Sequence, residues 1–203
     1  MVAIDPTKQT ERDNYKLLTG SIIPRPVAFV TTKSKQGTIN AAPYSYFNIV
    51  TSNPPMISIS VQRKNGEMKD TARNANECGE FVVHISDETY IDSINQTAAN
   101  LPSDQSEIKL TSLTTIPSTE IDVPGIKEAQ IRMECVIEHS IPLGGTGSEP
   151  ACDLLIGRVV YFHIADELYN EGKIRTEKLL PVSRLAGNDY AKLGEFFSLE
   201  RPE

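Results

Sequence analysis

What the sequence lacks narrows the classes of protein to consider. It contains no apolar run near the roughly 20 residues that a membrane-spanning helix needs, and its first residues are too polar for the apolar core of a secretory signal. We therefore expect a cytoplasmic protein that does not cross a membrane. Basic residues are fewer than acidic ones, and the formal net charge is −7. That balance argues against nucleic acid as a partner.

Cysteine and histidine are scarce, with three of each in the chain. The cysteines form no close pair, which is typical of reduced thiols in a cytosolic protein. The histidines are equally isolated, and neither C-x-x-C nor H-x-x-x-H spacing occurs. We therefore predict no metal site.

A dinucleotide-binding fingerprint is absent as well. The glycine-rich stretch within 142–151 reads Gly144-Gly145-Thr146-Gly147-Ser148, which lacks the G-x-G-x-x-G spacing and opens no helix. We interpret it as a hairpin loop, at the rim of a site if one lies nearby.

Apolar and polar residues alternate with the period of a strand in several places. The stretch 153–165 is apolar on both faces, and Gly157 within it permits a bulge. Strands are predicted at 27–32, 38–42, 56–62, 81–85, 129–141 and 153–165. Helices are predicted at about 7–19, 67–77 and 88–99, with Asp87 as the N-cap of the last, and 100–121 is a long connection. Hairpin-like spacing with few βαβ units predicts a mainly β fold, an antiparallel barrel with peripheral helices, in a single domain spanning 1–203.

The stretch 40–71 carries the most chemistry. In its strand Ile57, Ile59 and Val61 share one face, and the hydroxyls of Ser58 and Ser60 share the other, where they can bond the polar edge of a ligand. The aromatic turn before it can flank a flat ring. The cations after it, and the N-terminus of the helix that follows, can hold an anion. This combination suits a mononucleotide, although a half-buried strand followed by a solvated basic loop has the same pattern.

Several motifs in order resemble the flavin reductase-like family of FMN-binding split barrels. They are P-R-P-V-A-F-V-T-T from Pro24, G-T-I-N-A-A-P-Y-S-Y-F from Gly37, N-P-P from Asn53 and K-D-T from Lys69. The segment from Pro181 to Tyr190 resembles the family's late R-L-G-G-x-Y signature, with Ala186 in place of its first glycine. The resemblance extends from about Leu17 to Tyr190.

The resemblance implies an antiparallel split β-barrel that binds FMN rather than FAD and forms a homodimer with the flavin near the subunit interface. It implies a flavin reductase-like oxidoreductase in which NAD(P)H gives hydride to the flavin, which passes electrons to a small-molecule or protein acceptor. An electron carrier or flavin store reduced by a partner protein stays open. A haem or pyridoxine-type barrel is disfavoured because the histidines lie far apart, and a plain interaction domain would leave the ordered motifs unexplained.

The predicted cofactor-binding residues combine these arguments. They are Arg25, Ala42, Tyr44, Ser45, Tyr46, Phe47, Ser58, Ser60, Val61, Arg63, Lys69, Asp70 and Thr71. We assign the phosphate to Arg63, Lys69 and Thr71, and the ring to the turn from Tyr44 to Phe47, whose aromatic side chains have core packing as their alternative role.

Four residues receive further roles at this stage. The resemblance implies that Arg25 lies near the phosphate or ribityl end. Asp70 would repel a phosphate, so we expect it to cap the helix, orient Lys69 or bond a ribityl hydroxyl. Arg184 and Tyr190 are candidates beside the ring or the donor, with a surface salt bridge and a packed tyrosine as the alternative. No catalytic side chain is predicted, because a flavin carries its own chemistry.

Overall fold

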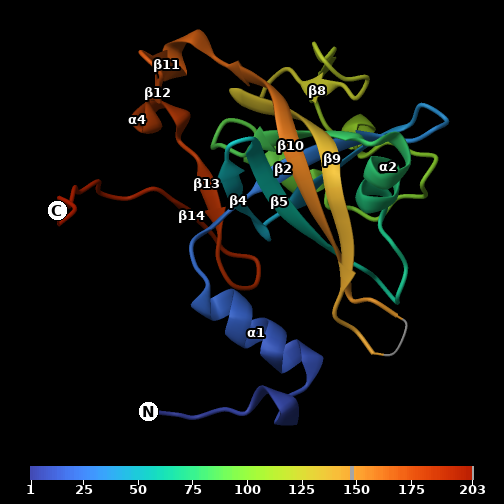
Figure 1. Ribbon diagram of the computed structural model, residues 1–203, viewed down its shortest axis with the longest axis vertical. Coiled ribbons are helices and arrows are strands. Elements are labelled where there is room, and N and C mark those ends of the chain that lie inside the picture. Colours follow the sequence, from blue (N-terminus) through green and yellow to red (C-terminus); the bar gives the residue numbers. More distant parts are fainter. Residues whose placement is uncertain (147–148, 203) are drawn as a thin grey trace.

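The structure, a computed structural model, describes residues 1–146 and 149–202. Its main sheet has seven antiparallel strands in the order β3-β2-β6-β9-β10-β5-β4 (Figure 1). Their bounds are β2 (Ala28–Lys33), β3 (Ile39–Tyr44), β4 (Phe47–Ser52), β5 (Pro55–Gln62), β6 (Glu80–Ile85), β9 (Ile131–Leu143) and β10 (Cys152–Ile164). The prediction of a mainly β, antiparallel fold is confirmed.

The two edge strands of this sheet, β3 and β4, are consecutive in the chain. Only Ser45 and Tyr46 separate them, and the amide of Ser60 on β5 donates to the carbonyl of Tyr46 at 2.9 Å. The sheet therefore curls until its edges meet at this turn. Pro43 fits here because proline, which has no N–H to donate, is tolerated on an edge strand.

The alternation of β5 determines which side chains fill the barrel. Ile57, Ile59 and Val61 are buried in the main core, whereas Ser58 and Ser60 on the other face are only half-buried. Fully buried side chains of this core come from β2, β5, β6 and β10 and include Val30, Ile59, Phe81 and Leu155. The predicted faces of this strand are confirmed.

The longest hairpin joins β9 and β10, as predicted. Its register shifts between Ile156 and Gly157, where β9 carries one extra residue, Glu138, and forms a bulge. A side chain at Gly157 would not fit, because its Cβ would lie 2.3 Å from Cζ of Phe81. Residues 147 and 148 of the predicted hairpin loop lie outside the described residues.

The helices surround the barrel and differ from the prediction at their ends. They are α1 (Glu11–Ser21), α2 (Asp70–Cys78), α3 (Ile91–Gln96) and α4 (Thr176–Leu179), with 3-10 turns η1 (Pro6–Lys8), η2 (Glu107–Leu110) and η3 (Asp166–Leu168). The predicted helix 88–99 is wrong in length. The Asp87 carboxylate accepts the amide and hydroxyl of Thr89, which forms a turn and delays the helix until after Tyr90.

Short strands complete the structure. A three-stranded sheet pairs β1 (Arg25–Pro26), β13 (Val182–Arg184) and β14 (Tyr190–Lys192), and β7 (Thr115–Ile116) pairs with β8 (Gly125–Ile126), as β11 (Tyr169–Asn170) does with β12 (Lys173–Ile174). Figure 1 shows α1 below the barrel and the C-terminal segment leading away from it. None of the helices in 1–146 and 149–202 has the length and apolar character to cross a membrane.

Candidate functional site

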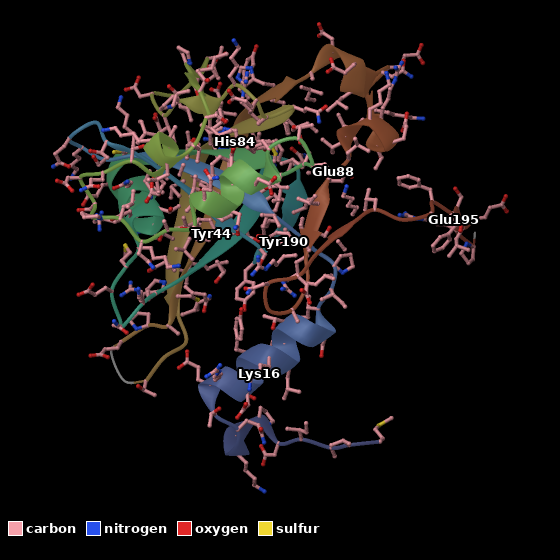
Figure 2. The ribbon with its side chains drawn as sticks, turned by 180° about the vertical axis from the view of Figure 1, so that it is seen from behind. Lys16, Tyr44, His84, Glu88, Tyr190 and Glu195 are labelled. Carbon is pink, nitrogen blue, oxygen red and sulfur yellow. The ribbon has the colours of Figure 1, made fainter. Side chains whose placement is uncertain are left out.

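Two hollows of about 480 Å³ each share the residues Pro43, Tyr44, Lys69 and Ala98. The first, which we call the helix hollow, is lined by the start of α2, the loop 64–68 and part of the segment 97–103. The second, the tyrosine hollow, is lined by Tyr15, Tyr46 and Tyr190 among others. Figure 2 shows Tyr44 and Tyr190 on the same side of the barrel, above α1. Because of the shared residues we treat the hollows as one cleft.

The helix hollow offers positive charge at a helix N-terminus. Lys69 occupies the N-cap position of α2 without a side-chain capping bond, so the first N–H groups of the helix keep their capacity to bind an anion. Lys64 and Arg73 also line this hollow. Burial, and then the nearby Lys64 charge, lower the pKa of Lys69. A bound anion would oppose this shift, because an opposite charge nearby favours the protonated form of Lys69.

Arg63, which the sequence predicts as a phosphate ligand, does not belong to this cationic set. Its Nε and Nη2 donate to the two carboxylate oxygens of Asp153 at 2.9 and 2.7 Å, and Nη1 donates to the carbonyl of Gly66. It lines neither hollow. A guanidinium with its fork filled by a buried carboxylate has little capacity left for a phosphate, so Arg63 fixes the loop after β5 to β10.

Asp70 and Thr71 also have other partners than expected. Asp70 is the first residue of α2, not its cap, and its carboxylate pairs with the guanidinium of Arg73. The Thr71 hydroxyl is buried, accepts from the Tyr44 hydroxyl at 2.8 Å and donates to Oδ1 of Asn40 at 2.6 Å. Its proton is therefore engaged, and an anion in the helix hollow would meet the main chain of Thr71 instead.

A buried polar network continues from Thr71 into the wall of the helix hollow. Nδ2 of Asn40 donates to one carboxylate oxygen of Glu107 at 3.0 Å, and the amide of Ala41 donates to the other at 3.1 Å. Burial raises the pKa of Glu107, and these two donors oppose the shift. Burial also raises the pKa of Tyr44 to about 12, so its phenol stays neutral. The network holds β3, α2 and η2 in one arrangement.

Arg25 lines the tyrosine hollow. Its Nη1 donates to the carbonyl of Thr19 at 2.7 Å and its Nη2 to that of Leu185 at 2.7 Å. Arg25 does not line the helix hollow. The guanidinium instead connects the end of α1 to the β13–β14 turn, beside Tyr46.

Arg184 and Tyr190 come together on the same wall. They face each other across the β13–β14 pair, and the Arg184 guanidinium carbon lies 4.5 Å above the centre of the Tyr190 ring. This cation–π contact orients both side chains, and both line the tyrosine hollow. Arg184 makes no salt bridge among the described residues, contrary to the alternative role considered for it.

The remaining predicted residues divide between three surfaces. Ala42 lines the helix hollow, and Ser45, Tyr46 and Ser60 line the tyrosine hollow. Phe47 and Ser58 line an adjoining apolar hollow of about 390 Å³ that shares Arg25 with the cleft. The Val61 side chain is wholly buried in the core, so only its main chain is available to a ligand.

Sequence reasoning missed residues that distant segments bring to the cleft. They are Tyr15, Thr19, Arg73, Asn95, Ala98, Glu107 and Asn188. No local pattern marks them. A clue existed only for Glu107, which lies in a connection long enough to suggest a function.

The cleft fits a flavin mononucleotide in its chemistry. Cations and a helix N-terminus lie in one hollow, a group of tyrosines lies in the other, and the donors between them are hydroxyls and amides. In the part of the chain that the structure describes, no three His, Cys, Asp or Glu side chains come together as metal ligands would.

Comparison with known proteins also indicates a flavoprotein. The model of the flavin reductase like domain matches residues 19–178. A crystal structure of nitrilotriacetate monooxygenase component B from Bacillus cereus is 69% identical, with a TM-score of 0.97 over 98% of each chain. A 2-nitrobenzoate 2-nitroreductase from Pseudomonas fluorescens is 32% identical, with a TM-score of 0.88 over 99% of this chain and 96% of that one.

The fold is the split barrel. A Shewanella frigidimarina structure with a split barrel domain has a TM-score of 0.83 at 17% identity, covering 97% of this chain and 96% of that one. The chain belongs to the flavin reductase-like family of split-barrel flavoproteins.

Proposed function

We propose that this protein is a flavin-dependent oxidoreductase that binds FMN in the cleft, with the phosphate in the helix hollow and the ring in the tyrosine hollow. The observation that carries the proposal is the junction of a cationic helix N-terminus and a tyrosine-lined hollow at Tyr44 and Lys69. When bound, the flavin accepts a hydride from NAD(P)H and passes electrons to a second acceptor.

Each part of the cleft has a separate task in this proposal. Lys69, Lys64 and the first N–H groups of α2 hold the phosphate. Arg63 is not a phosphate ligand, because Asp153 occupies its guanidinium. Pro43 and Tyr44 line both hollows and would contact the ribityl chain. Tyr46 and Ser60 border the ring, and the Arg184–Tyr190 pair covers the side from which a nicotinamide would approach.

The electron acceptor is proposed from the similarity to two named proteins. The similarity to a protein named as component B of a monooxygenase supports electron delivery to a separate protein component. The similarity to a nitroreductase supports a small aromatic acceptor as the second candidate.

We also propose a homodimer. Apolar side chains stay exposed at the end of α1 and along β4, namely Leu18, Ile22, Ile23, Ile49 and Val50. The end of α1 and the start of β4 line the same apolar hollow, next to the cleft. A second copy seated on this surface would remove these side chains from water and would place the subunit interface beside the flavin.

The phosphate assignment is tested by comparing FMN with riboflavin, which lacks the phosphate. Lys69→Ala should weaken FMN binding about 10- to 100-fold, since a hydrogen bond to a charged group is lost, and should change riboflavin binding little. Lys127→Ala, outside the cleft, is the matched control. Equal losses for both ligands in Lys69→Ala, or no FMN binding by the wild type, would overturn the assignment.

The donor is tested by anaerobic absorption spectra of the FMN-loaded protein. Bleaching by NADH or NADPH supports a reductase. Flavin that stays oxidised with both donors, yet is reduced by another redox protein, supports the electron carrier instead.

A further inference from the structure

The charges around the tyrosine hollow are all of one sign. Among the described residues that line it, Arg25, Lys69 and Arg184 are cations, and none is an aspartate or glutamate. This contrasts with the chain as a whole, which has 27 acidic and 20 basic residues. The helix hollow, by comparison, has Glu67, Asp70 and Glu107 in its walls.

Arg25 is the most enclosed of these three cations. It is 7% exposed, and it forms no ion pair with an acid in 1–146 and 149–202. Its known partners are backbone carbonyls, and its Nε is buried without any hydrogen-bond partner. An arginine cannot lose its proton in a protein, so the structure keeps an uncompensated positive charge here.

Such a charge is costly unless something in the site balances it. The Leu185, Thr19 and Ile22 carbonyls solvate the guanidinium with dipoles but leave its charge in place. Its neighbour across the β1–β13 pair is Arg184, a like charge. Because water screens little at a buried group, the field of Arg25 acts across the tyrosine hollow.

We propose that Arg25 stabilises the negatively charged, reduced form of the bound flavin relative to the oxidised form, and so raises its reduction potential. Reduced nicotinamide supplies two electrons and one proton and leaves oxidised, so the ring gains one net negative charge. Arg25 attracts that charge, with Arg184 as a more exposed second source. This inference rests on the proposed function, because it needs the flavin ring in the tyrosine hollow.

The consequence is a difference in affinity between the two redox states. The Arg25 charge increases the affinity for reduced flavin relative to that for oxidised flavin, compared with the same protein without this charge. A tenfold change in the ratio of the two affinities equals about 30 mV for a two-electron couple.

The experiment measures the reduction potential of bound FMN by anaerobic equilibration with a reference dye. Arg25→Gln removes the charge and should lower the potential by at least the equivalent of a tenfold change in that ratio. Arg25→Lys keeps the charge but loses the guanidinium fork, so its potential should stay close to the wild type even where its thermal stability falls with that of Arg25→Gln. Arg132→Gln changes the net charge equally, away from the cleft, and should leave the potential unchanged.

Two results would overturn the inference. One is an Arg25→Gln protein that binds FMN at the wild-type potential, and the other is an equal shift in Arg25→Lys and Arg25→Gln, which would indicate a structural cause. If Arg25→Gln does not fold, Arg184→Gln takes its place and should shift the potential in the same direction by less. Failure of the wild type to bind FMN would instead refute the proposed function.

Discussion

His84 shows how a single buried side chain sets a pH limit on this fold. Its Nδ1 lies 2.8 Å from the carbonyl of Phe29, and its Nε2 accepts the amide of Ile126 at 2.8 Å. One ring nitrogen donates and the other accepts, so the ring is neutral. Burial, with a smaller contribution from the Arg132 charge, lowers the pKa of His84 to about 3, although the Phe29 carbonyl opposes the shift.

We predict that His84 makes the protein less stable in mild acid. Between the unfolded pKa of about 6.5 and the folded pKa of about 3, the unfolded state binds a proton that the folded state excludes. The free energy of unfolding should therefore fall with decreasing pH, with a His84 contribution of up to about 1.4 kcal/mol per pH unit. His84→Gln should lose this contribution, as measured by urea unfolding at pH 7.5, 6 and 5. Parallel pH dependences of the two proteins would contradict the prediction.

Residue roles were the least predictable part of the site. The motif K-D-T pointed to the start of α2 correctly, but it could not reveal that the Thr71 hydroxyl is engaged by Tyr44 and Asn40. Arg63 looked free because its partner Asp153 lies 90 positions away. A side chain's chemistry can be read from sequence, whereas its availability depends on which distant group reaches it first.

At the scale of elements, strands were predicted well and helix ends poorly. The period of two identified β5 and β9 because one face of each meets the core. The start of α3 was mispredicted, since the Asp87–Thr89 turn competes with the helix there. The end of α2 was predicted closely. The glycine that follows it, Gly79, adopts the left-handed conformation of a helix C-cap.

Gly157, opposite the bulge in β9, yields a prediction at the same scale. Gly157→Ala would bring a Cβ within 2.7 Å of two Phe81 ring atoms, so either the ring or the strand must move. We expect a loss of about 1–3 kcal/mol in the free energy of unfolding, as for other overpacked cores. Gly20→Ala is the matched control: nothing lies within 4 Å of its Cβ, and it sits in α1, where alanine is favoured. Chemical denaturation in which Gly157→Ala matched Gly20→Ala would refute the proposed clash.

For the whole molecule, the exposed apolar surface on β4 predicts the oligomeric state. Ile49 is 76% exposed, and Ile49→Asp should convert the proposed dimer to a monomer, because a buried unpaired carboxylate is costly at an interface. Leu110→Asp is the control, since Leu110 is also exposed but lies on η2. Sedimentation velocity distinguishes the states. A monomeric wild type, or an Ile49→Asp dimer as stable as the wild type, would contradict the prediction.

The order of the strands has a consequence for how a ligand enters. The cleft follows β3 and the turn to β4, which are the two edges of the sheet, so its mouth coincides with the seam where the barrel closes. Moving these edges apart leaves the ladders of β2, β6, β9, β10 and β5 intact. The barrel can therefore open locally at the seam while the rest of the sheet stays paired. Backbone amide hydrogens of β3 and β4 should then exchange with solvent faster than those of the central strands.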